Sequence, residues 1–273
     1  MTRPDWNEVQ AYEDITHHKC DGVARIAFNR PEEGLPRVAE AEFSSVSVAP
    51  VVSARRARSP RAVVPLLAAL AVAACGRNAA LYEPTPAMLE FEAPDSFLVD
   101  IETSEGTFTV KMRRHWSPAG VDRVWHLMDN DYYAGARIYR VVPGFVAQWG
   151  LTGDPELDSI WRGHTLPDEP TVASNLRGVV AFARAGPETR GTQLFVNLVD
   201  NVRLDAMMSG GVEGFPPIGE IEAGLEVVDG FYSAYNDRTP SQDSIRIVGN
   251  DYLRREYPQL DSIVGTRITG YWR

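Results

Sequence analysis

The chain has 273 residues, 44% hydrophobic and 10% aromatic, which is typical of a globular protein with one large domain or two small ones. Its formal net charge of -10 argues against a nucleic-acid-binding protein, which needs a basic surface. The two cysteines, Cys20 and Cys75, cannot form a disulfide framework, and neither they nor the five histidines have metal-ligand spacing. We therefore expect no metal and no cofactor.

The N-terminal region, residues 1–33, is mixed and polar, and the run VARIAF at 23–28 predicts a short strand. The stretch from Trp6 to Glu32, WNEVQAYEDITHHKCDGVARIAFNRPE, resembles the opening of a dihydroxynaphthoyl-CoA synthase of the crotonase family. The resemblance covers only the first strand region, and a crotonase needs a far longer chain to build its CoA site. We expect residues 1–54 to be a crotonase-like fragment of a chimeric reading frame or a disordered extension, without acyl-CoA chemistry.

Residues 55–75 have the pattern of a secretory signal. A cluster of arginines at 55–61 precedes the apolar run AVVPLLAALAVAA at 62–74, which is shorter than the ~20 residues of a membrane-spanning helix. The run ends in Val72-Ala73-Ala74-Cys75, which resembles the lipobox of bacterial lipoproteins and implies that Cys75 is acylated. Two lipid-anchoring signals are generally needed for stable membrane attachment, and acylation of this cysteine would supply them.

The lipobox resemblance implies a lipid-anchored protein of the cell envelope, on the periplasmic or extracytoplasmic side. If the internal signal is not used, the product stays in the cytoplasm. The alternative for this segment is a buried core helix with an incidental cysteine, which Pro65 and the basic flank disfavour. Residues 76–96 contain several prolines and predict a linker between the anchor and a domain.

Residues 97–249 show the alternation and turn signals of a folded domain. The predicted elements, in chain order, are a hairpin at 97–114, a helix from Ser117-Pro118 to about residue 130, strands at 137–143 and 145–150, a polar loop at 151–176, strands at 178–184, 192–198 and 216–221, a helix at 224–235, a strand at 244–249 and a tail at 250–273. In the polar loop we expect His164, Asp168 and Glu169 to be solvated. Many short strands, two helices and no βαβ repeat predict a mainly β fold, a closed antiparallel barrel with helical caps.

Two sequence motifs suggest a binding site. RIYRVVPGFVAQWG at 137–150 and VAFARAGPETRGTQLFV at 180–196 are apolar, strand-like runs that Gly and Pro interrupt, with large polar side chains embedded in them. A guanidinium, two aromatic walls and two amides on one face of a sheet would form a small apolar site with directed hydrogen-bond donors. Such a site can act on a peptide backbone without a nucleophile or a metal.

The first motif, in YRVVPGFVAQWG, resembles the FHRxxPGFxxQGG signature of cyclophilin-type peptidyl-prolyl cis-trans isomerases. The second, in FARAGPETRGTQLFV, resembles their MANAGPxTNGSQFFI signature, and NVRLD at 201–205 stands where they have a TEWLD-like stretch. The resemblance covers about residues 97–249. It implies an eight-stranded cyclophilin-like barrel capped by two helices, isomerisation of X-Pro bonds in protein folding, and proline-containing polypeptides as substrates. It also implies a monomer that meets the membrane only through its lipid anchor.

The resemblance assigns site residues position by position. Arg140 matches the catalytic arginine. The positions that match substrate-binding residues are Phe145, Val146, Gln148, Ala183, Arg184, Ala185, Gln193, Phe195, Leu204 and Phe215. The chain departs from the family's pattern where Arg184 replaces an asparagine, Arg203 a tryptophan, Phe215 a histidine and Trp149 a glycine. Losing the tryptophan is expected to weaken the binding of cyclosporin-like macrocycles.

These residue types fit the chemistry. An X-Pro amide rotates slowly because the partial double bond gives a barrier of about 18–20 kcal/mol. Twisting the bond makes the nitrogen pyramidal, and a donor aimed at its lone pair binds the twisted state better than either planar state. Arg140 is a suitable donor because its guanidinium stays charged, and an apolar cage favours the less polar twisted amide. The alternatives are a cyclophilin-like module that grips proline segments without turnover and, for the aromatic residues, a purely structural core role.

Overall fold

The computed structural model describes residues 15–20, 23–28, 77–236 and 238–273, which fall into two compact units, 1–75 and 76–273. In the first unit β1 (Ile15–Cys20) pairs antiparallel with β2 (Val23–Phe28), so the strand predicted at 23–28 is confirmed. Cys75 and the apolar run at 62–74 lie outside the described residues. Within the ranges that the structure does describe, no helix is both long enough and apolar enough to cross a bilayer.

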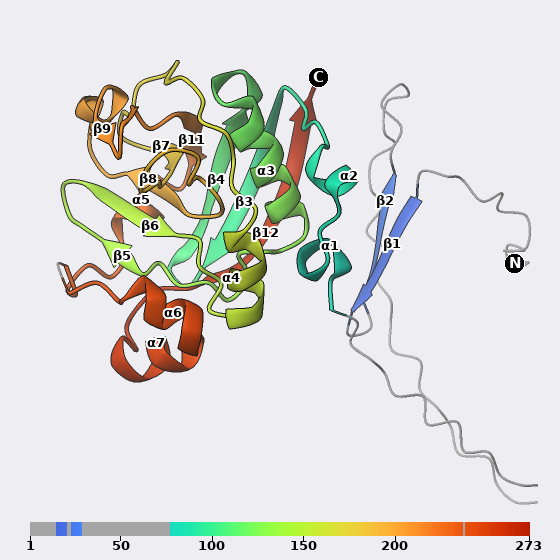
Figure 1. Cartoon of the computed structure of the whole chain (residues 1–273). Helices are drawn as coiled ribbons and strands as arrows, with labels where there is room; N and C mark the ends of the chain where they lie inside the picture. The colour runs from blue at the N-terminus through green and yellow to red at the C-terminus, as the bar shows by residue number, and fades with distance from the viewer. Residues whose placement is uncertain (1–14, 21–22, 29–76, 237) are drawn as a thin grey trace, which may run out of the picture. The chain divides into compact units, whose positions relative to one another are not determined.

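The second unit is built around one eight-stranded antiparallel sheet (Figure 1). The strand order is β12-β3-β4-β11-β7-β8-β6-β5. The bounds of these strands, from one edge of the sheet to the other, are β12 (Ile263–Trp272), β3 (Ser96–Thr103), β4 (Gly106–Arg113), β11 (Pro217–Ala223), β7 (Val179–Phe182), β8 (Leu194–Asn197), β6 (Val146–Trp149) and β5 (Arg140–Val141). A separate small hairpin pairs β9 (Met208–Ser209) with β10 (Val212–Glu213).

The sheet is curled but is not the closed barrel that the sequence predicted. Its two edge strands, β12 and β5, share no ladder of hydrogen bonds. The chain just before β5 meets the start of β12 at an isolated bridge, Arg137 to Ser262. Three backbone hydrogen bonds flank it, from Ile138 N to Asp261 O at 2.9 Å, from Ile263 N to Ala136 O at 2.8 Å and from Gly135 N to Ile263 O at 2.8 Å. β5 is only two residues long, so no continuous hydrogen-bonded ladder joins the two edges of the sheet.

Helices surround the sheet. Their bounds are α1 (Ala79–Tyr82), α2 (Pro86–Leu89), α3 (Pro118–Asp129), α4 (Pro155–Arg162), α5 (Leu225–Asp229), α6 (Gln242–Val248) and α7 (Asn250–Glu256), with 3₁₀ turns at Arg114–Trp116 and η3 (Val202–Asp205). The long helix α3 lies across the face formed by β3 and β12 (Figure 1). It buries Val121, Val124 and Leu127, because helical spacing aligns them in one apolar stripe.

Buried and more exposed side chains alternate along β3, as expected for a strand with one face on the core. In β3 the side chains of Phe97, Val99 and Ile101 are fully buried, and each has an exposed or half-buried neighbour. The ring of Phe97 packs edge-on against Trp125 of α3 with the centroids 4.8 Å apart. The predicted hairpin at 97–114 is therefore confirmed as β3 and β4, and it forms the layer on which α3 rests.

The polar loop at 151–176 contains a helix that the sequence analysis missed. α4 begins at Pro155 because the side chain of Asp154 accepts hydrogen bonds from the backbone N–H groups of Glu156 (2.9 Å) and Leu157 (3.3 Å). In the same loop Glu169 is not solvated as expected. Its carboxylate accepts from the N–H groups of Ala119 (2.8 Å) and Gly120 and so caps the start of α3, where the Ser117 side chain makes no capping hydrogen bond.

The C-terminal part differs most from the prediction. The strand expected at 244–249 is wrong, because these residues lie in α6. Its N-terminus is capped by the side chain of Ser241, which accepts from Ser244 N at 3.3 Å, and Ile245 is buried. The helix predicted at 224–235 is confirmed only as the five-residue α5, which ends at Gly230. Residues 250–273, expected as a tail, form α7 and the edge strand β12, which pairs with β3.

Candidate active site

Strand register sets four motif residues in one row across the sheet. Arg140 on β5 stands opposite Gln148 on β6, and Gln148 stands opposite Phe195 on β8. Phe195 in turn stands opposite Ala181 on β7. Residues directly opposite one another in antiparallel strands project to the same face of the sheet. The two motifs, about 40 residues apart in the chain, therefore place the guanidinium, an amide and a phenyl ring side by side.

A tight turn brings a second aromatic ring to Arg140. The N–H of Phe145 donates to Val142 O at 3.0 Å, and Gly144 takes a φ of +73°, the left-handed conformation that a Pro-Gly type II turn requires. The guanidinium carbon of Arg140 lies 5.6 Å from the centroid of the Phe145 ring. This is a cation–π contact. Arg140 is half-buried and forms no ion pair with any carboxylate that the structure describes.

The apolar residues of both motifs meet in one packed group, which we call the aromatic cluster. Its buried members are Val146, Ala181, Phe195 and Leu204, and its half-buried members are Phe145, Ala183 and Phe215. The rings of Phe195 and Phe215 meet edge to face, with centroids 6.0 Å apart. The cluster thus brings together six residues that the sequence assigned to the site. Two of them, Leu204 and Phe215, lie outside the two motifs.

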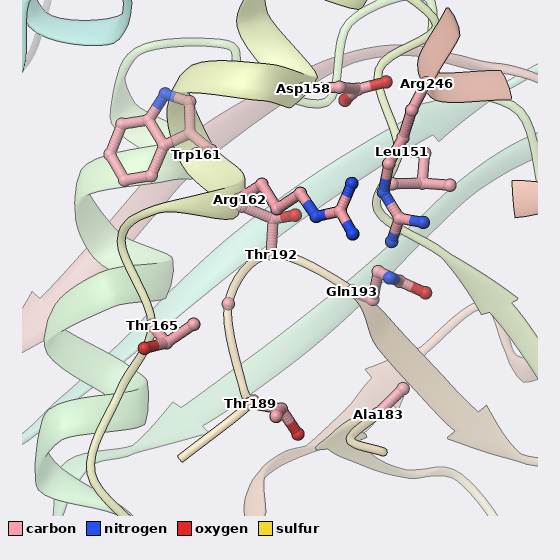
Figure 2. Close-up of a pocket in the computed structure, with 11 residues that line it drawn as sticks. Leu151, Asp158, Trp161, Arg162, Thr165, Ala183, Thr189, Thr192, Gln193 and Arg246 are labelled. Carbon is pink, nitrogen blue, oxygen red and sulfur yellow. The ribbon is translucent and has the colours of Figure 1, made fainter. Parts of the chain in front are cut away.

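A chain of hydrogen bonds runs from Arg140 through Gln148 to Gln193, the two predicted amides. Arg140 Nη1 donates to Gln148 Oε1 at 3.2 Å. Gln148 Nε2 donates to Gln193 Oε1 at 3.1 Å and to the Tyr139 hydroxyl at 2.8 Å. The carbonyl oxygens of both amides are therefore occupied, which fixes how each amide is turned. Gln193 and Ala183 also line a small pocket next to the cluster (Figure 2).

Tyr139 is a site residue that the sequence analysis missed. Its hydroxyl donates to Gln193 Oε1 while it accepts from Gln148 Nε2, so it ties the two amides together. Burial raises the pKa of Tyr139 well above its ordinary value, which keeps the hydroxyl a donor. The available signal was its place directly before Arg140 in an apolar run, where a buried tyrosine needs a partner for its hydroxyl.

Gly150 lets the two motifs approach closely. Its φ is +123°, and a Cβ at this position would lie 2.4 Å from the Cα of Gln193. Thr192 Oγ1 donates to Gly150 O at 2.8 Å across the same gap. A side chain at residue 150 would push Gln193 away from Gln148. Trp149, the residue before Gly150, departs from the family's pattern. It is fully buried in the main core against Phe108.

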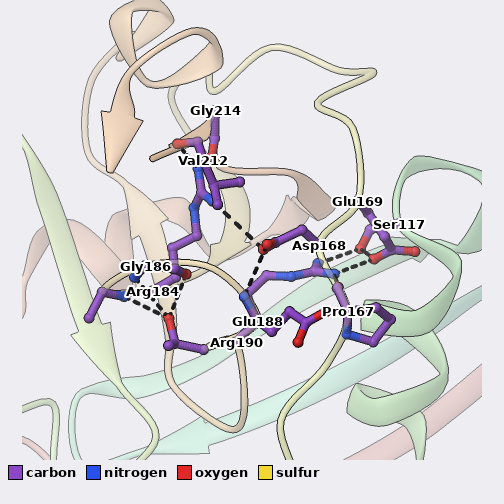
Figure 3. Close-up of polar contacts among 12 residues, drawn as sticks. Ser117, Pro167, Asp168, Glu169, Arg184, Gly186, Glu188, Arg190, Val212 and Gly214 are labelled. Carbon is purple, nitrogen blue, oxygen red and sulfur yellow. Dashed lines mark hydrogen bonds and ion pairs between the residues drawn. The ribbon is translucent and has the colours of Figure 1, made fainter. Parts of the chain in front are cut away.

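The side chain of Arg184 is directed toward Val212, Gly214 and Asp168 (Figure 3). It is 1% exposed, donates to Val212 O at 2.8 Å and to Gly214 O, and forms an ion pair with Asp168 at 3.7 Å. Its guanidinium carbon lies 5.0 Å from the centroid of the Phe215 ring. Arg184 therefore supports the back of the aromatic cluster. Ala185 is exposed beside it, and its N–H donates to Thr189 Oγ1 at 3.0 Å.

Arg203 stands at the outer edge of the cluster, on η3. It is exposed, and its guanidinium carbon lies 4.9 Å from the centroid of the Phe145 ring, the same ring that Arg140 contacts. A tryptophan at this position would offer an aromatic surface, whereas arginine offers a charge. The backbone of Phe145 is held from this side by Asn201, whose Nδ2 donates to Phe145 O at 2.9 Å.

Comparison with known families identifies the fold and the motifs together. The family model described as cyclophilin type peptidyl-prolyl cis-trans isomerase/CLD matches residues 98–250. The chain belongs to this family. The match contains every residue of the row, the aromatic cluster and the amide pair, and it makes the protein a peptidyl-prolyl cis-trans isomerase.

Relatives from fungi, bacteria and plants support the assignment. A peptidyl-prolyl cis-trans isomerase-like 1 of Neurospora crassa is 33% identical over 110 residues, which cover 39% of this chain and 68% of the relative. A peptidyl-prolyl cis-trans isomerase of Acinetobacter baylyi is 25% identical over 133 residues, covering 48% and 70%. The isomerase CYP18-2 of Arabidopsis thaliana is 30% identical over 146 residues, covering 52% and 84%. Among solved structures, a cyclophilin type isomerase of Cryptosporidium parvum is 20% identical, with a TM-score of 0.45 and coverage of 64% of this chain and 98% of that one.

Proposed function

We propose that this prolyl isomerase twists the X-Pro bond at the edge of the aromatic cluster, with Arg140 as the donor to the amide nitrogen. The observation that carries the proposal is the setting of its guanidinium. The group lies 5.6 Å over the Phe145 ring, is held by Gln148 at 3.2 Å, and has no carboxylate partner among the described residues. A guanidinium has five N–H donors, and one bond to Gln148 leaves others for a substrate.

The cluster would hold the proline ring while the bond turns. Phe145, Phe195 and Leu204 offer an apolar surface that a pyrrolidine ring can cover without losing hydrogen bonds. As the amide twists, its nitrogen loses conjugation and gains a lone pair. A fixed cation then binds the twisted amide better than either planar form, and that difference lowers the barrier. No proton has to move, so the step needs no acid or base.

Gln193 would align the rest of the substrate. Its Oε1 accepts from both Tyr139 and Gln148, so the amide is turned with Nε2 away from them. That N–H₂ is a donor suited to a carbonyl of the bound peptide. Holding the backbone on one side of the proline while the other side rotates converts binding energy into a directed twist.

The proposal is tested by NMR exchange spectroscopy on a proline-containing peptide. The full chain is expected to accelerate cis–trans exchange, and Arg140→Ala is expected to lose that acceleration while still shifting the peptide resonances on binding. Arg267→Ala is the control, since Arg267 is a 67% exposed arginine on β12 that pairs with Asp100. Equal exchange rates with the wild type and with Arg140→Ala would contradict the assignment of Arg140.

We further propose that the isomerase is lipid-anchored at Cys75 and acts at the cell envelope. The sequence pattern of 55–75 supports this. The fold begins soon afterwards, because the indole N–H of Trp161 donates to Leu81 O at 2.9 Å and Leu81 is buried. Only five residues separate Cys75 from Leu81, a span of at most ~20 Å, so the anchor would hold the domain near the membrane surface. Intact-mass analysis of the membrane fraction tests it, with a chain that begins at acylated Cys75 expected and one that begins at Met1 contradicting it.

A further inference from the structure

The pocket beside the aromatic cluster has a volume of about 80 Å³. Drug-sized ligands occupy pockets of about 300 Å³ or more, so this one suits a single side chain. Gln193 and Ala183 of the site form one wall, and Leu151, Thr189 and Thr192 continue it. A substrate held at Gln193 therefore has this pocket directly next to its backbone.

Two arginines from different helices point into the pocket. Figure 2 shows Arg162 of α4 and Arg246 of α6 with their guanidinium groups directed toward Gln193. Arg162 is exposed and forms no ion pair with a carboxylate that the structure describes. Arg246 pairs with Asp243 on its own helix at 3.4 Å, and the Asp243 side chain is 78% exposed. The Arg246 side chain is itself 20% exposed and also donates to Gln242 Oε1 at 3.3 Å. An ion pair with an exposed carboxylate is weak, so N–H groups of both arginines remain available to a ligand.

The acidic group in the pocket wall offsets only part of the charge of these two cations. Asp158 is the only carboxylate among the lining residues that the structure describes. It is buried and accepts hydrogen bonds from Thr152 N at 2.8 Å, Thr152 Oγ1 at 2.9 Å and Gly153 N at 3.2 Å. The carboxylate is thus engaged with the backbone turn before α4. The pocket keeps an excess of positive charge in a chain whose net charge is -10.

We propose that this pocket binds an anionic side chain that flanks the isomerised proline, so that acidic X-Pro segments are the substrate class. The inference rests on the proposed function, because the pocket matters only if the peptide lies along Gln193. Two guanidinium groups facing one cavity repel each other, and an anion between them replaces repulsion with charge-assisted hydrogen bonds. The planar fork of arginine fits a carboxylate or a phosphate oxygen pair.

The test uses the full chain and matched peptides with one proline. Glu, Gln, Lys or phosphoserine is placed at each of three positions on either side of the X-Pro bond, and NMR measures affinity and exchange rate in the same samples. At one position Glu is expected to lower Kd about five- to tenfold relative to Gln, as a charge-assisted pair should. The exchange rate at saturation should stay the same, since the pocket does not touch the twisting bond.

Charge reversal separates recognition from structure. Arg162→Ala with Arg246→Ala should equalise Glu and Gln peptides, and Arg246→Glu should turn the preference toward Lys. Arg254→Ala is the matched control, because Arg254 pairs with Asp251 at the same i,i+3 spacing on the next helix, α7, and does not line the pocket. It should leave the preference for Glu unchanged.

The outcomes are distinct. Equal affinity for Glu and Gln peptides at every position, or a preference that survives the double substitution, overturns this inference even when exchange is fast. If no peptide shows accelerated exchange, the proposed function is contradicted instead. The affinities of the Glu and Gln peptides still show whether the pocket binds an anion. Tighter binding of phosphoserine than Glu at the same position would support the pocket and assign its anion as a phosphate.

Discussion

Arg140 and Arg190 belong to the two motifs and have opposite surroundings. Arg140 is half-buried, lies on a phenyl ring and has no carboxylate partner among the described residues. Arg190 is completely buried, forms an ion pair with Glu169 at 2.8 Å, and donates to Ser117 Oγ at 3.0 Å and to Pro167 O (Figure 3). The difference shows that a motif arginine is available for substrate only when the fold leaves its donors unpaired.

The two arginines also connect different parts of the molecule. Through Glu169, Arg190 joins the loop before β8 to the start of α3, because Glu169 also caps that helix. Arg140 joins only neighbouring strands through Gln148. Substitutions at Arg190 should therefore change mainly the stability of the fold, and substitutions at Arg140 mainly the activity.

Arg190→Met is expected to have the largest effect, on stability. Removing one partner leaves the Glu169 carboxylate buried without its cation, and broken buried pairs typically cost about 3–5 kcal/mol. Urea denaturation should show a fall of that size in the free energy of unfolding. The activity per folded molecule should be close to that of the wild type. A loss of stability under about 1 kcal/mol would mean that Arg190 does not support the fold in this way.

Arg140→Ala should have the opposite profile. Loss of one positioned donor to a transition state typically lowers turnover about 100- to 1000-fold. The free energy of unfolding should change by less than about 1 kcal/mol, because the residue is half-buried and unpaired. Arg140→Lys keeps the charge but not the planar fork, so it should recover only part of kcat/KM. A variant that loses stability and activity together would remove the distinction between the two arginines.

Arg184 lies between these extremes. Its side chain is buried and paired as in Arg190, yet it packs on Phe215, a wall of the aromatic cluster. Arg184→Met should release the Val212 and Gly214 carbonyls at a cost of about 1–3 kcal/mol. It should also raise KM several-fold with little change in kcat, since we expect Phe215 to line the substrate-binding surface away from the twisting bond. Unchanged KM in a destabilised variant would show that Phe215 does not depend on this contact.

Sequence reasoning predicted which motif residues lie together better than it predicted the C-terminal elements of the fold. The turn Pro143-Gly144 sets the register of β5 on β6, so Arg140 falls opposite Gln148, whereas the pairing of Gln148 with Phe195 is a long-range contact that the family motifs indicated. The strand predicted at 244–249 was wrong because SIRIV alternates in sequence, while the Ser241 cap makes a helix. The partner of Arg190 could not be predicted, since Glu169 lies in a loop whose path depends on tertiary packing.

Tyr139→Phe tests whether the amide pair must be aligned for Arg140 to act. The hydroxyl donates to Gln193 and accepts from Gln148, beside the direct hydrogen bond between the two amides, and each lost bond costs about 1 kcal/mol. If that cost falls on the transition state, kcat/KM should drop several-fold to tenfold. The protein should stay folded, because a phenyl ring fills the same buried space. A Tyr139→Phe enzyme as active as the wild type would show that Gln148 alone positions the guanidinium.

The smallest predicted effect concerns pH and two histidines. Burial lowers the pKa of His126 below its ordinary value of 6.5, although its Nε2 bonds to Ala80 O at 3.0 Å. Burial, with the Arg123 guanidinium nearby, also lowers the pKa of His164. Between each lowered pKa and 6.5 the unfolded chain binds a proton that the folded chain does not, so unfolding is favoured by acid.

The free energy of unfolding should therefore fall as the pH drops below about 6.5 and level off beneath the folded-state values. Calorimetry from pH 8 to pH 5 measures the effect as a decline in Tm. His126→Gln keeps an N–H donor for Ala80 O without the titration, so the decline should be shallower, and shallower still when His164→Gln is added. An equally steep decline in the double variant would assign the acid sensitivity to carboxylates instead. Isomerase turnover over the same range should follow only the folded fraction, because the donor that Arg140 supplies does not depend on either histidine.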